Sequence, residues 1–256
     1  MNEEFTNNDA VIETIEPLTQ AEAMSGVISD PFNTFDTIGK SGKKNYWLLP
    51  TLILVIVSVI ASFIFLSNAE LVDKVMDKQY KKVEKKMEES VKNGKMSRED
   101  ANIALEKTKS FMNPKSAFFM ITSYGGPFLF VFFRLFLTAS LLMLLLKILK
   151  GDYTFENILN VVGLAFLISA VGKILEIVLS VVMGDMVNIS LGLIFKEESV
   201  GSFLNNLLSF FDVFTIWFYA VVSIGLAKIG KVKTTSVVIP VFAAMLIISL
   251  VISLFA

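Results

Sequence analysis

Five apolar stretches of about twenty residues each limit how this chain can fold. They cover roughly residues 47–66, 128–149, 158–183, 203–227 and 237–256. An α-helix rises 1.5 Å per residue, so a helix of this length matches the hydrocarbon thickness of a bilayer. The mean hydropathy of +0.66 lies above the ordinary soluble range. We therefore expect an all-α, polytopic membrane protein with five transmembrane helices.

The stretch between the first two spans, residues 67–116, has a different character. Apolar residues recur there at steps of three and four from Val72 to Val91, which predicts an amphipathic helix. Asn93-Gly94 interrupts the pattern, and Ser97 begins a sequence typical of a helix N-cap. We expect an extramembrane helical hairpin whose first arm continues span one directly. It would be either a solvated spacer or a docking surface for a partner or the membrane.

The sequence before the first span divides into two segments. Residues 1–28 form an acidic tail that we expect to be partly disordered, because residues 1–39 contain eight acidic and no basic residues. In residues 29–45, Asp30 and Pro31 predict the start of a short amphipathic helix. This helix would either lie on the membrane surface or pack against the bundle. The expected interfacial anchors are Pro31, Phe32, Phe35, Tyr46 and Trp47. Residues 46–256 would form the membrane domain.

Four ionisable residues fall within the proposed spans: Arg134, Lys173, Glu176 and Asp212. Each costs about 2.5–3.5 kcal/mol at the centre of a membrane helix, so isolated placement is unfavourable. Arg134, Glu176 and Asp212 lie at a similar depth below one surface, with Lys173 one helical turn deeper. We predict an intramembrane polar cluster in which Arg134 pairs with Glu176 or Asp212.

Three interpretations of this cluster are open. It can be an ionic lock that holds three spans together, or a polar cavity for an ion, a proton or a lipid headgroup. In the third, Arg134 and Lys173 extend to the interface and Asp212 caps a shorter helix.

The orientation follows from the distribution of lysines in the short loops. The flanks of spans one, two and four that fall on one side carry Lys40, Lys43, Lys44, Lys147, Lys150, Lys228, Lys231 and Lys233. We therefore expect a cytoplasmic N-terminus and an external C-terminus. The hairpin would lie outside, where its twelve basic residues are nearly balanced by nine acidic ones.

The residue types that are missing argue against most catalytic and metal-binding sites. The chain has no histidine and no cysteine, so Ser–His and Cys–His catalysis and the usual zinc and haem sites have no ligands here. Gly39-Lys40-Ser41-Gly42 lacks the glycine spacing and the strand of a phosphate loop. We predict a protein that is not an enzyme, with no catalytic, cofactor or metal site and no nucleic-acid partner.

Three short motifs resemble the Ypt-interacting-protein (Yip) domain family, in its prokaryotic branch. They are Ser29-Asp30-Pro31-Phe32-Asn33-Thr34-Phe35, the Lys150-Gly151-Asp152 turn with Phe155, and Asp212-Val213-Phe214-Thr215-Ile216-Trp217. The Asp-Leu-Tyr-Gly-Pro element of eukaryotic relatives is not found. The resemblance implies a five-span bundle with a cytoplasmic N-terminus in the cell membrane and a non-catalytic role.

Two functions follow as hypotheses. The first is an integral membrane adaptor or assembly protein, accessory to a transport or export system, with a protein partner in or at the bilayer. The second is a small transporter or lipid-handling protein that uses the polar cluster. Self-association is compatible with either.

Overall fold

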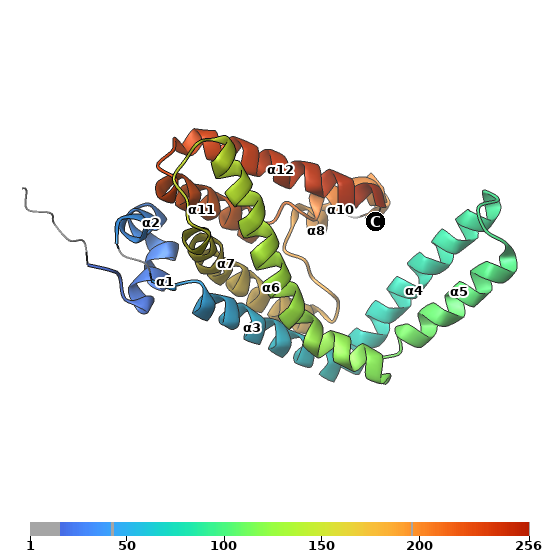
Figure 1. Cartoon of the computed structure of the whole chain (residues 1–256). Coiled ribbons are helices and arrows are strands. Elements are labelled where there is room, and N and C mark those ends of the chain that lie inside the picture. The colour runs from blue at the N-terminus through green and yellow to red at the C-terminus, as the bar shows by residue number, and fades with distance from the viewer. Residues whose placement is uncertain (1–15, 42–43, 196, 256) are drawn as a thin grey trace, which may run out of the picture.

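The chain folds into a bundle of helices from which one pair of helices projects (Figure 1). The computed structural model describes residues 16–41, 44–195 and 197–255. In these residues the helices are α1 (Gln20–Ser29), α2 (Pro31–Lys40), α3 (Leu48–Ser67), α4 (Ala69–Lys92), α5 (Arg98–Phe111), α6 (Ala117–Ile148), α7 (Phe155–Met183), α8 (Leu191–Ile194), α9 (Glu197–Val200), α10 (Ser202–Leu208), α11 (Val213–Ile229) and α12 (Thr234–Phe255).

Helix α7 is the centre of the bundle. Every residue from 158 to 168 is buried, and α1, α2, α3, α6 and α11 all contact this helix. A helix segment that is apolar on all sides needs neighbours all round, which explains why this part lies inside the protein. The second half of α7 instead exposes side chains such as Val178 and Val182.

The outer surface of the bundle is strongly apolar. Helix α6 exposes Leu129, Phe130 and Phe133, and α12 exposes Ile247 and Leu254. Four helices are long and apolar enough to cross a membrane: Leu48–Ser67, Ala117–Ile148, Phe155–Met183 and Thr234–Leu254. An apolar surface of this extent is the normal exterior of a protein surrounded by lipid. The protein is therefore a multi-pass membrane protein.

The predicted continuous span over residues 203–227 is wrong. Helix α10 ends at Leu208, the chain turns through residues 209–212, and α11 begins at Val213. Asp212 is the N-cap of α11, because its Oδ1 accepts a hydrogen bond of 2.8 Å from the backbone N–H of Thr215. The side chain that we placed within the fourth span thus starts a new helix, as one of our three interpretations expected.

The predicted start of span two is also wrong. Helix α6 begins at Ala117, capped by Ser116, and continues through Gly125, Gly126 and Pro127. Proline removes one backbone donor, which a membrane helix tolerates when its surroundings compensate. The 32 residues of α6 extend about 48 Å, more than the hydrocarbon core requires.

Helices α4 and α5 pack against each other and form a hairpin that projects from the end of the bundle opposite α1 and α2 (Figure 1). The turn between them contains Gly94 with a φ of +66°, and Ser97 caps α5. The predicted direct continuation from span one is wrong, since Asn68 ends α3 and α4 begins as a separate helix after it. The side chain of Asn68 accepts a hydrogen bond from the N–H of Leu71 and so caps α4 separately.

The N-terminal segments lie against the bundle. Most of the described part of the predicted acidic tail forms α1, where Ala23 and Val27 are fully buried. Residues 1–15 lie outside the described residues. Helix α2 begins as the sequence indicates, with Asp30 as N-cap and Pro31 in the first turn. It packs on α11, which favours the bundle-packing interpretation of this segment.

Candidate functional site: a polar cavity between α3, α6, α7 and α11

The four charged residues of the predicted cluster line one cavity of about 720 Å³. Helix α6 contributes Arg134, α7 contributes Lys173 and Glu176, and Asp212 stands at the start of α11. Hydroxyl groups surround them, from Ser58, Ser62, Thr122, Ser123, Ser169 and Thr215. Two cations, two carboxylates and many hydroxyls thus meet between helices whose outer surfaces are apolar.

Arg134 does not form the predicted ion pair. Among the described residues, neither Glu176 nor Asp212 lies within the 4.0 Å of an ion pair with its guanidinium. The Cζ atom instead lies 4.8 Å from the ring centroid of Phe218 and 5.2 Å from that of Phe166. The guanidinium therefore packs beside two neighbouring aromatic rings and lines the cavity.

The acidic groups have different partners. The Nζ of Lys173 lies 3.5 Å from Oε2 of Glu176, one turn away on the same helix. Asp212 accepts the capping hydrogen bond from Thr215 and lines the same cavity as Glu176. Two carboxylates and a guanidinium thus line one cavity.

A second cavity of about 370 Å³ continues from the first along α7. The two share Ser62, Lys173 and Glu176, and the second reaches Ser180 of α7 and Asn188 in the segment that follows α7. The polar lining therefore extends from the middle of the bundle toward the end where α4 begins.

The predicted interfacial anchors do not line this cavity and lie on α2 and in the segment that leads into α3. Phe35 and Tyr46 are almost completely buried, while Phe32 is 43% exposed. The ring of Phe35 packs against Gly225 of α11, and the ring of Phe32 lies 4.1 Å from Nζ of Lys228. Pro31 occupies the first turn of α2, and Trp47 packs against Gly163 of α7.

Sequence reasoning missed a polar contact that holds the segment before α3. The buried side chain of Asn160 accepts hydrogen bonds from the N–H groups of Tyr46 and Trp47 and donates one to the carbonyl of Lys44. A single asparagine within the apolar run of residues 158–168 was the available signal, because a buried polar group requires a partner.

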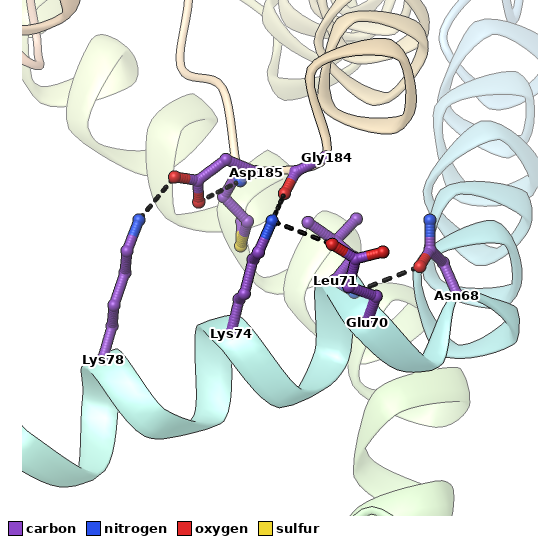
Figure 2. A network of polar contacts seen from close by, with 8 residues as sticks. Asn68, Glu70, Leu71, Lys74, Lys78, Gly184 and Asp185 are labelled. Atoms are coloured by element: carbon purple, nitrogen blue, oxygen red, sulfur yellow. Dashed lines mark hydrogen bonds and ion pairs between the residues drawn. The ribbon is translucent and has the colours of Figure 1, made fainter.

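A second missed contact fixes the root of the hairpin. Lys78 of α4 forms an ion pair of 2.5 Å with Asp185, and Lys74 donates to the carbonyl of Gly184 at 3.1 Å (Figure 2). Gly184 has a φ of +62° and ends α7 in the left-handed conformation. The hydrogen bond from the Lys78 ammonium lowers the pKa of Asp185 from its ordinary value. Two lysines one turn apart thereby tie α4 to the end of α7.

No group of three or more residues able to hold a metal ion occurs among the described residues.

Comparison with known proteins gives one match. The family model described as "Yip1 domain" matches residues 25–256, nearly the whole chain. No curated protein and no solved structure matches significantly. The matched region includes the cavity, the hairpin and the α2 contact.

Proposed function

This chain belongs to the Yip1 domain family, and from that premise we propose that it acts as a non-catalytic integral membrane adaptor or assembly protein. Its partner would be another protein in or at the cell membrane. The observation that carries this proposal is the hairpin of α4 and α5, which projects from the bundle and is tied at its root by Lys74 and Lys78 (Figures 1 and 2).

The anchored root favours a binding role over a simple spacer. A spacer needs no fixed direction, whereas an adaptor gains affinity when its binding element is already oriented. The hairpin also presents Ile103 and Phe111 on its surface, 47% and 57% exposed, among many charged residues. We propose these two side chains as contact residues for the partner protein.

We propose five membrane crossings, with the N-terminus in the cytoplasm and the hairpin and C-terminus outside. Helix α11 has 17 residues and extends about 25 Å, at the lower limit for a crossing. Lysines gather at one end of the bundle, where Lys228 lies 3.5 Å from Asp36 and Lys231 lies 2.8 Å from Asp152. The basic residues of the hairpin at the other end are nearly balanced by acidic ones, so the lysines of the short loops support this orientation.

The adaptor proposal is tested by crosslinking in cells. Because the native chain has no cysteine, a single cysteine at position 103 or 111 can carry a photoactivatable crosslinker. We expect one specific protein adduct that disappears when residues 69–111 are replaced by a short Gly-Ser linker. A cysteine at Val182, an exposed residue of α7, is the matched control. If hairpin and control positions capture the same proteins, the adaptor proposal is wrong.

The cavity supports a second candidate function, the handling of a polar or lipid ligand within the membrane. Four ionisable side chains and six hydroxyl-bearing residues line it, more than a structural lock among three helices requires. Neutralising Arg134 and Asp212 in a folded protein should abolish this function and leave hairpin crosslinking unchanged. If these variants instead lose hairpin crosslinking, the charged cluster supports the structure of the adaptor and is not a separate ligand site.

A further inference from the structure

We propose that the polar cavity binds the headgroup of a zwitterionic phospholipid with a primary ammonium, of the phosphatidylethanolamine class. The phosphate would contact Arg134, and the ammonium would lie between Glu176 and Asp212. This inference rests on the second candidate function and names its ligand.

The cationic half of the site is prepared for a phosphate. The guanidinium of Arg134 lies beside the stacked rings of Phe166 and Phe218 and lines the cavity. Among the described residues, no carboxylate lies within ion-pair distance of it. A guanidinium presents a fork of donors that matches the oxygens of a phosphate.

The anionic half is prepared for a cation. Glu176 and Asp212 line the same cavity. Lys173 contacts Glu176 at 3.5 Å, whereas among the described residues the side chain of Asp212 accepts only the capping N–H of Thr215. An ammonium placed between two carboxylates relieves their repulsion and can donate three hydrogen bonds. The hydroxyl groups of Ser169 and Thr215, which also line the cavity, can form hydrogen bonds with the remaining polar atoms of the headgroup.

The location of the cavity favours a lipid over a soluble headgroup. Phe130 lines the cavity and is also 65% exposed, so the polar space reaches the apolar outer surface of α6. Leu129 and Phe133 on the same surface are 70% and 64% exposed. Acyl chains could lie along this surface while the headgroup enters the cavity, and the two charged halves would make a neutral ligand the best match.

The test uses the full chain in phosphatidylcholine nanodiscs and a photoactivatable phosphatidylethanolamine, with adducts mapped by mass spectrometry. Unlabelled phosphatidylethanolamine should compete at least about tenfold better than phosphatidylglycerol, which has the phosphate but no ammonium. Free glycerophosphoethanolamine, which has the headgroup without acyl chains, should compete weakly. Adducts should map to α6 and α7 near the cavity.

Variants then assign the two halves. Arg134→Gln should weaken phosphatidylethanolamine binding about tenfold, and Glu176→Gln with Asp212→Asn should remove the preference over phosphatidylglycerol. Lys147→Gln and Glu156→Gln, on the same helices but outside the cavity, should change neither. Chromatography in detergent checks folding, and the selectivity of the unmodified chain decides the question if a variant does not fold.

The outcomes separate the two proposals. If phosphatidylglycerol competes equally well and binding still depends on Arg134, the ligand need not be zwitterionic. The cavity would then be a general phospholipid site. Strong competition by glycerophosphoethanolamine would show that acyl chains are not needed, and the ligand would then be a soluble headgroup rather than a lipid. Adducts outside the cavity that no variant affects would overturn both the inference and the second candidate function.

Discussion

The side-chain oxygen of Asn160 lies 2.8 Å from the backbone nitrogen of Tyr46, although 114 residues separate them in the sequence. The same oxygen accepts a hydrogen bond from Trp47 at 3.1 Å, and the amide nitrogen donates to Lys44 at 2.9 Å. Asn160 is 1% exposed and Tyr46 is 1% exposed. One buried amide therefore satisfies three backbone groups of the segment that leads into α3.

Replacing Asn160 with alanine should destabilise the protein by about 3 kcal/mol, because buried backbone groups without partners each cost about 1–3 kcal/mol. The measurement is reversible unfolding in mixed micelles, followed by circular dichroism. Asn157→Ala, one turn earlier on α7, is the matched control and should change stability by less than about 1 kcal/mol. Equal effects at positions 157 and 160 would contradict the role of this amide.

Gly163 allows α3 and α7 to approach each other. A Cβ at this position would lie 2.5 Å from Cβ of Trp47 and 2.7 Å from its carbonyl oxygen. Gly163→Ala should therefore cost about 1–3 kcal/mol by forcing the helices apart. Gly125→Ala in α6 has open space around the added methyl and should be neutral or slightly stabilising, by up to about 1 kcal/mol. Thermal melting of both variants in detergent compares them directly, and a neutral Gly163→Ala would rule out this close approach.

Local signals in the sequence predict the helix starts well. Asp30 with Pro31, and Ser97 before Arg98, act within one helical turn, so their effect does not depend on the rest of the chain. The same locality explains the error at Asp212. Apolar residues on both sides of it suit one long helix, while its carboxylate also suits an N-cap, and only packing decides between them.

The candidate site was partly predictable. Counting residues along the spans placed Arg134, Glu176 and Asp212 at a similar depth in the membrane, and in the structure all three line one cavity. Their pairing was not predictable, because sequence spacing does not give the rotation of one helix relative to another. That rotation puts Phe166 and Phe218 beneath Arg134. The contact between Asn160 and Tyr46 was equally hidden, since no periodicity connects them.

Two phenylalanines of α2 should respond differently to truncation. Phe35 is fully buried against Gly225 of α11, so Phe35→Ala should cost about 3–5 kcal/mol. Phe32 is 43% exposed and only covers the ammonium of Lys228, so Phe32→Ala should cost about 0.5–1 kcal/mol. Unfolding measurements on the two variants provide the comparison. If Phe32→Ala proved the more damaging, α2 would not pack on the bundle as described.

The ion pair between Lys78 and Asp185 should fix the direction of the hairpin. With no native cysteine, spin labels can be placed on single cysteines at Lys85 of α4 and Val182 of α7. Pulsed electron paramagnetic resonance should give a narrow distance distribution for the unmodified ion pair. Lys78→Gln should broaden it, because Asp185 then loses its charged partner. Lys82→Gln, one turn further along α4, should leave it narrow.

Acid should broaden the same distribution. The hydrogen bond from Lys78, the largest cause, lowers the pKa of Asp185 below its ordinary value of 3.8. The folded state therefore binds this proton less readily than the unfolded chain, so the contribution of the pair is complete above the unfolded pKa. It disappears as the pH falls through the lower, folded pKa. We expect a constant distribution from neutral pH to about pH 4 and broadening below it. Exchanging the charges with Lys78→Asp and Asp185→Lys should restore a narrow distribution at neutral pH. A broad distribution for the exchanged pair would mean that contacts other than this pair orient the hairpin.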